Sequence, residues 1–150
     1  MPDLDAAMRD LSRWLGVAWT NAQEAPLVLR TRAGDEPVQL RFAYSTGAPP
    51  YFELLESHAS GYYAAPDGAF LHHVGRWVDD LPAASRALAA AGLPLEAAGV
   101  GPDGDAPALF AFHAGAHGTR VELVDAGNRA NFEAWLAGGE LVLDPSRGAA

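Results

Sequence analysis

The sequence predicts an α+β fold built from two βαβββ modules, the first of which lacks its opening strand. Two pairs of similar segments indicate the repeat. Pro2–Leu4 resembles Asp79–Leu81, and each segment precedes a predicted helix. Phe52–Glu56 resembles Val121–Asp125, and each segment ends one half of the chain. Similar segments in the same order are typical of one supersecondary unit used twice. Module one is expected at about residues 1–60, module two at about 70–137, and a C-terminal tail at 138–150.

Composition limits the class of protein. The chain has 150 residues, of which 49% are hydrophobic, and this predicts a single domain with a packed core. The net charge of −9 argues against nucleic acid as a partner, because no basic surface is available for phosphates. The chain has no cysteine, which excludes disulfides and thiolate metal sites. No apolar run is long enough to span a membrane and no signal peptide is recognisable, so we expect a cytoplasmic protein without membrane contact.

The first module is expected to begin with a helix over Asp3–Leu15. Asp3 is suited to cap this helix and Gly16 to end it. The apolar residues of the helix recur three and four positions apart, which predicts one buried stripe: Leu4, Ala7, Met8, Leu11 and Leu15. A short strand is expected to begin at residues 17–19, and residues 27–30 are either another segment of it or a separate strand. Further strands are expected at residues 38–44 and 51–56, and a loop at 57–69.

The second module is expected to begin with a strand over Leu71–Val78, which leads directly into a helix over Leu81–Ala91. Asp80 is suited to cap that helix, Pro82 to occupy its first turn, and Gly92 to follow its end. Further strands are expected at residues 95–100, 109–113 and 120–125, with a short helix at 132–137 and a frayed tail at 146–150.

The predicted strand over Leu71–Val78 carries the residues most suited to metal binding or proton transfer. Strand side chains alternate between faces, so His73, Gly75 and Trp77 are expected on one face and Val74 and Val78 on the other. A histidine at the head of a strand that feeds a capped helix is well placed to bind a metal or to move a proton.

Four segments together resemble the vicinal oxygen chelate superfamily, which includes glyoxalase I, methylmalonyl-CoA epimerase, extradiol dioxygenases and bleomycin-resistance proteins. They are PDLDAAMRDLSRWLGV, YFELLE, HHVGRWVDDLPAASRALAAAGLPLE and GTRVELVDA, and the resemblance runs from Pro2 to about Trp135. It implies one glyoxalase-like domain whose paired modules form a cupped, barrel-like sheet with helices outside and a metal site inside. It also implies glyoxalase-like or epimerase-like chemistry, drug binding or dioxygenase chemistry, since one fold hosts several functions.

The resemblance implies that His73, Glu53 and Glu122 are metal ligands. One imidazole and two carboxylates suit zinc, nickel, cobalt, manganese or iron(II). The two glutamates are also the expected catalytic residues, one of them exchanging between ligand and base. The superfamily's fourth ligand position, on the opening strand of module one, falls before Met1. Either three residues build the site, or the natural chain begins upstream with a strand that carries the fourth ligand; the second interpretation is favoured.

Four other residues are candidates for substrate binding. Gly75 leaves room for a substrate and Trp77 supplies an apolar wall. Arg41 either meets a carboxylate or oxyanion of the substrate or, as the favoured alternative, forms an ion pair with Glu53 or ends in solvent. His113 is either a substrate contact or general base or a hydrogen-bonded core residue. His72 competes with His73 for the ligand role, but alternation puts His72 on the face of Val74 and Val78. His73 is therefore preferred, and His72 is expected to be a neighbour of the ligand or a hydrogen-bond donor to it.

The function expected from these residues is a divalent-metal-dependent lyase or isomerase that acts on a small oxygenated substrate by carbonyl polarisation and proton transfer. An alternative from another class is a metal-free protein that sequesters a hydrophobic or drug-like molecule, as bleomycin-resistance proteins do. A further alternative is an extradiol-type dioxygenase, although those iron enzymes favour two histidines and one glutamate. A small-molecule substrate and a possible homodimer complete the expectation.

Overall fold

The computed structural model describes residues 1–65 and 71–142, so the predicted frayed tail at 146–150 lies outside the described residues. The described chain divides into two compact units. The first comprises residues 1–26, 39–65 and 131–142, and the second comprises residues 27–38 and 71–130. The described helices include none that is long and apolar enough to cross a membrane.

The strands form one hydrogen-bonded order, β3-β2-β1-β5-β6-β7-β4. β4 returns beside β7 in parallel, whereas β5–β6 and β6–β7 are antiparallel, which is the order of a complete βαβββ module. The order β3-β2-β1 repeats this arrangement without an opening strand, so the predicted α+β fold of paired modules is confirmed. The strands are β1 (Gln23–Thr31), β2 (Gly34–Tyr44), β3 (Glu53–Leu55), β4 (Val74–Val78), β5 (Leu95–Gly99), β6 (Phe110–Ala114) and β7 (Arg120–Asp125).

The helices agree closely with the sequence patterns. They are α1 (Leu4–Leu15), α2 (Leu81–Ala90) and α3 (Arg129–Leu136), with short 3-10 turns at Ala116–Gly118 and Ala126–Asn128. Asp3 caps α1 through the amide of Ala6, and Gly16 follows α1 in the left-handed conformation. Asp80 caps α2 through the amide of Ala83. Both predicted caps are therefore present.

In the first unit, α1 and α3 contact the two faces of the strand pair β2–β3. Leu4 of α1 is fully buried with Ala43 and Leu54, whose side chains lie on one face. On the other face, Tyr44 lies edge-on to Trp135 and Phe132 of α3, with ring centroids 5.8 Å and 4.8 Å away. This division leaves the α1 face largely aliphatic and the α3 face aromatic.

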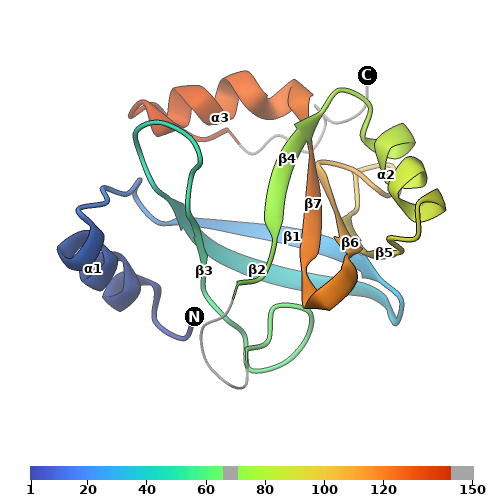
Figure 1. Ribbon diagram of the computed structural model, residues 1–150, viewed down its shortest axis with the longest axis horizontal. Helices are drawn as coiled ribbons and strands as arrows, with labels where there is room; N and C mark the ends of the chain where they lie inside the picture. The colour runs from blue at the N-terminus through green and yellow to red at the C-terminus, as the bar shows by residue number, and fades with distance from the viewer. Residues whose placement is uncertain (66–70, 143–150) are drawn as a thin grey trace. The chain divides into compact units, whose positions relative to one another are not determined.

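In the second unit, α2 packs on one face of β5, β6 and β7 (Figure 1). Leu81 and Leu123 are buried at the centre of this core. The other members of the core are small or β-branched: Val78, Ala98 and Ala111. Because strand side chains alternate, every second residue of β7, starting with Arg120, lies on the face away from α2.

The repeat is visible in backbone hydrogen bonds as well as in the sequence. Val78, two residues before the helix cap at Asp80, pairs in parallel with Asp125 of β7. Met1, two residues before the cap at Asp3, bonds to the outer edge of β3: its ammonium donates to the carbonyl of Leu55, and its carbonyl accepts from the amide of Ser57. The junction between strand edge and helix is thus built alike in both modules.

The sequence patterns misplaced two parts of the sheet. One is the start of β4, which begins at Val74 and not at Leu71; the other lies in the first module. Residues 17–19 form no strand beyond a single bridge between Trp19 and Ser45, whereas β1 runs from Gln23 through Pro26 to Thr31. Proline argues against a central strand because it cannot donate to a ladder. Here the ladder with β5 starts only at Leu29, so Pro26 lies outside it.

We predict that Asp80→Ala lowers the free energy of unfolding by about 1 kcal/mol, because the amide of Ala83 loses its side-chain acceptor. The measurement is urea denaturation followed by circular dichroism. Asp79→Ala, which removes the neighbouring exposed carboxylate, is the matched control and should change stability by less than about 0.5 kcal/mol. Equal effects of the two substitutions would show that charge, and not the cap, matters here.

Candidate metal centre

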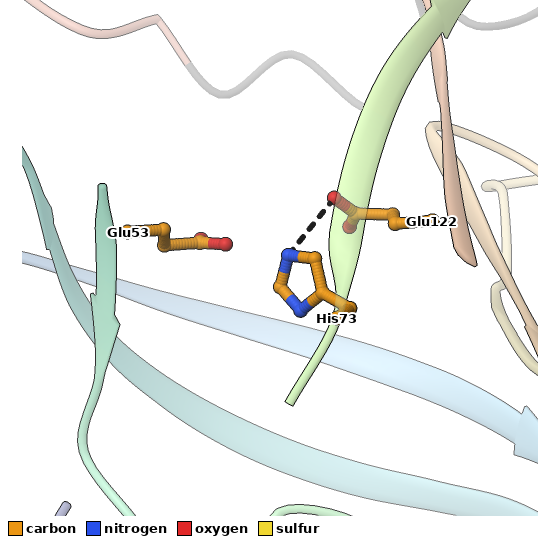
Figure 2. Close-up of side chains that lie close together, drawn as sticks. All are labelled: Glu53, His73 and Glu122. Atoms are coloured by element: carbon orange, nitrogen blue, oxygen red, sulfur yellow. Dashed lines mark ion pairs between the residues drawn. The ribbon is translucent and has the colours of Figure 1, made fainter. Parts of the chain in front are cut away.

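The parallel pairing of β4 with β7 brings together a histidine and a glutamate. Gly75 of β4 lies opposite Glu122 of β7, and His73 directly precedes β4. The Nε2 atom of His73 lies 3.3 Å from Oε2 of Glu122, as the dashed line in Figure 2 marks. The two side chains are only 9% and 12% exposed. An imidazole nitrogen and a carboxylate oxygen are thus held side by side in a sheltered place, where electrostatic interactions are stronger than in water.

Gly75 makes room for this pair. A Cβ atom at position 75 would lie 3.0 Å from Oε2 of Glu122 and 4.0 Å from the His73 ring. Any other residue there would displace the Glu122 carboxylate by a few tenths of an ångström. Trp77 pairs with Val124, so it lies on the same face two residues further along β4 and is half-buried. Both residues therefore lie on the face on which the sequence places them.

Phe112 forms the floor beneath the histidines. It pairs with Glu122 across β6 and β7, is 2% exposed, and its ring centroid lies 5.2 Å from that of His73 and 5.4 Å from that of His72. Phe112 is not among the site residues predicted from the sequence. Alternation along β6 would have misplaced it, because His113 is the site candidate on that strand and neighbouring strand residues face opposite sides.

His72 does not lie on the face where alternation put it. Its Nδ1 is 3.1 Å from Nδ1 of His73, and its ring packs edge-on against Phe112, on the Glu122 side of the sheet. Strand alternation fails here because β4 begins only at Val74. Burial, reinforced by the positive charge of Arg120, lowers the pKa of His72 to about 3. His72 is therefore a neutral imidazole at ordinary pH.

An ion pair lies on the same face of the sheet as Glu122. Arg120, two residues before Glu122 on β7, donates from Nε to Oε2 of Glu96 over 2.6 Å. Both side chains are about a quarter exposed, at 25% and 30%. The two-residue spacing from Glu122 was the signal that could have identified Arg120 from the sequence.

Glu53 belongs to the first unit. It starts β3 opposite Tyr44, on the face away from α1, and it is half-buried. Figure 2 draws its side chain together with those of His73 and Glu122, which belong to the second unit. One imidazole and two carboxylates form a nitrogen and oxygen donor set that fits divalent zinc, nickel, cobalt, manganese or iron.

Arg41 of β2 and Glu53 of β3 lie on opposite faces of the β2–β3 pair. The Arg41 guanidinium bonds to Glu56 at 2.6 Å and to Asp5 at 3.0 Å, and these hydrogen bonds raise its pKa. The expected ion pair with Glu53 is wrong, because Glu53 and Glu56 are an odd number of residues apart on an extended segment and face opposite sides. Arg41 links β2 to α1 and is not proposed as a substrate contact.

His113 is a buried core residue in this structure. Its side chain has no exposed surface, and both ring nitrogens have partners: Nε2 lies 2.9 Å from Oγ of Ser85, and Nδ1 lies 2.8 Å from the carbonyl of Leu93. His113 faces α2, one residue along β6 from Phe112 and on the opposite side. The hydrogen-bonded core alternative considered for this residue is therefore the one the structure supports.

A family model described as the Glyoxalase/Bleomycin resistance protein/Dioxygenase superfamily matches residues 1–112. This is the superfamily that the sequence motifs resemble, so that prediction is confirmed. No curated protein and no solved structure matches the chain significantly. The matched range includes Glu53 and His73 but ends before Glu122, whose position beside His73 follows from the β4–β7 register.

We predict that Ser85→Ala destabilises the fold by about 1–3 kcal/mol, because it leaves Nε2 of the buried His113 without its hydroxyl partner. Thermal and urea unfolding measure the loss. Ser60→Ala, at an exposed serine, is the control and should have little effect. If Ser85→Ala left stability unchanged but abolished ligand binding, the structural role assigned to His113 would be wrong.

Proposed function

The chain belongs to the glyoxalase/bleomycin resistance protein/dioxygenase superfamily, and we propose that it is a divalent-metal-dependent lyase or isomerase acting on a small oxygenated substrate. The reaction class is carbonyl polarisation followed by proton transfer at a neighbouring carbon. The observation that carries this proposal is the sheltered pair of His73 Nε2 and Glu122 Oε2 at 3.3 Å, with a glycine facing it.

His73, Glu122 and Glu53 are the proposed ligands. The donor set supports this assignment, because a neutral imidazole and two carboxylates suit a borderline or hard divalent ion. Low exposure of His73 and Glu122 supports it too, since a buried carboxylate needs a compensating positive charge. When bound, such an ion supplies a Lewis acid that polarises a substrate carbonyl.

The two glutamates are the proposed proton carriers. A carboxylate can accept a proton from a carbon next to a polarised carbonyl and return it to a neighbouring atom, provided that it lies within hydrogen-bond reach of that proton. Glu122 is held beside His73, whereas Glu53 comes from the first unit on a short strand. In this proposal both glutamates would help to hold the ion, and one of them would also act as the base.

Gly75 and Trp77 are the proposed substrate-side residues. Gly75 presents backbone without a side chain next to the carboxylate of Glu122, so a substrate can approach closely. Trp77 is half-buried on the same face and offers an aromatic surface. The buried ring of Phe112 excludes water on the sheet side of the reacting groups, which strengthens the interactions of any charge that develops there.

Two alternatives within the superfamily lead to different expectations. A dioxygenase of the extradiol type favours two histidines and one glutamate, whereas the candidate group here has one histidine. A metal-free binding protein needs no metal ligands, so the metal content of the purified protein distinguishes it from the proposed enzyme. Metal analysis therefore tests the proposal before any substrate is known.

We predict that the purified chain binds a divalent metal stoichiometrically and that His73→Ala abolishes this binding. Glu122→Gln and Glu53→Gln should each weaken the affinity about tenfold or more, because each removes an anionic ligand. The measurements are metal analysis after dialysis and titration with zinc. His58→Ala is the matched control, since the His58 ring bonds to the carbonyl of Gln39 and belongs to no candidate group among the described residues. Equal metal content in the His73 and His58 variants would rule the proposal out.

We also predict metal-dependent exchange of a carbon-bound hydrogen next to a carbonyl when 2-oxo or 2-hydroxy compounds are incubated with the protein in deuterium oxide. Replacing the glutamate that acts as base should slow this exchange by about 10²–10⁴-fold. Proton NMR of the substrate measures the exchange. Glu53→Gln and Glu122→Gln are compared under saturating metal, so that a loss of metal is not mistaken for a loss of the base. Absence of exchange across such compounds would favour the binding function.

A further inference from the structure

The histidine next to the proposed ligand contacts it through the nitrogen that faces away from Glu122. Nδ1 of His72 and Nδ1 of His73 lie 3.1 Å apart, which is hydrogen-bond distance between two nitrogens. A neutral imidazole carries its proton on one nitrogen and a lone pair on the other, so one ring must donate at Nδ1 and the other must accept there. The protonation patterns of the two rings are therefore coupled.

We propose that His72 is a positioning residue whose Nδ1 accepts the Nδ1 proton of His73, so that His73 presents an unprotonated Nε2 to the metal. This inference rests on the proposed function, because it concerns how His73 serves as a ligand. Metal-binding histidines commonly donate their second ring N–H to a carboxylate or carbonyl, which fixes both the tautomer and the orientation of the ring. Here the contact places a neighbouring imidazole in that role.

Packing holds the two rings in this arrangement. His72 and His73 meet edge-on, with planes at 88° and centroids 5.4 Å apart. Phe112, itself 2% exposed, lies against both rings, with its plane at 85° to that of His72. A change in the position of His72 therefore affects His73 through a direct contact and through a shared neighbour.

The coupling implies that the hydrogen bond reverses when His73 becomes a ligand. Without metal, Nε2 of His73 lies 3.3 Å from the Glu122 carboxylate and is suited to carry the proton toward it, which leaves Nδ1 of His73 to accept from His72. With Nε2 engaged as a ligand, the proton of His73 must sit on Nδ1, and His72 must hold its own proton on Nε2. Each ring keeps one proton throughout, so the pair rearranges without a net gain or loss of charge.

The first test compares two substitutions of His72. His72→Phe keeps an aromatic ring against Phe112 but removes the acceptor, whereas His72→Asn keeps an oxygen at the position of Nδ1. We expect His72→Phe to weaken zinc affinity by about 10–100-fold and His72→Asn to recover most of it. His58→Phe is the matched control and should bind zinc as the unsubstituted chain does. Circular dichroism of each variant establishes that it is folded.

The second test measures which ring nitrogens of His72 and His73 are protonated, a property that a purely structural role of His72 would not change on metal binding. Nitrogen-15 NMR of histidine-labelled protein distinguishes protonated from unprotonated ring nitrogens. On addition of zinc to the unsubstituted chain, Nδ1 of His73 should become protonated and Nδ1 of His72 unprotonated. Zinc-bound protein in which Nδ1 of His72 carries the proton would overturn the inference, even if His72→Phe failed to fold.

The outcomes separate this inference from the proposed function. If the unsubstituted chain binds none of zinc, nickel, cobalt, manganese and iron(II), the metal-dependent function fails and the role of His72 fails with it. If the unsubstituted chain binds zinc tightly and folded His72→Phe binds it equally well, the function stands and only the role of His72 is overturned. Weakened binding in His72→Phe, recovered in His72→Asn, supports both.

Discussion

The parallel ladder between β4 and β7 is the constraint on which the candidate site depends. It places Gly75 opposite Glu122 and so brings His73 within 3.3 Å of the Glu122 carboxylate. A slip of one residue would turn Glu122 toward the helix core and Leu123 toward the site, because strand side chains alternate. The register is held from the other side by Val78 and Leu123, which are buried under α2. The hydrophobic core thus specifies the position of the polar pair.

In the second unit, one face of the sheet carries the buried core residues and the other carries the candidate site residues. Ala111, His113 and Leu123 face α2, while Phe112 and Glu122 face the other way. A histidine on each face has a different set of hydrogen-bond partners. His113 is fully buried with both nitrogens bonded, because a buried polar atom without a hydrogen-bond partner would destabilise the fold. His73 keeps one nitrogen toward a carboxylate, and that contact gives it a candidate chemical role.

Much of the fold could be predicted because its signals are local. The caps Asp3 and Asp80, the apolar stripe of α1 and the alternation in β7 depend on neighbours within a few residues. The predicted face of Gly75 and Trp77 also follows from local alternation. Prediction failed where distant partners decide: Arg41 pairs with Glu56 and Asp5, and β1 extends through Pro26 because the ladder with β5 begins only at Leu29.

The sequence by itself determined the order of elements, the repeat and the superfamily, since all of these are recorded in spacing and residue type along the chain. Only the tertiary structure decided that His113 is a core residue, that His72 lies against His73 and Phe112, and that Arg120 pairs with Glu96. These outcomes depend on which strands become neighbours and where a strand begins. Residues far apart in the chain meet through the register of the sheet, and local periodicity carries no record of that register.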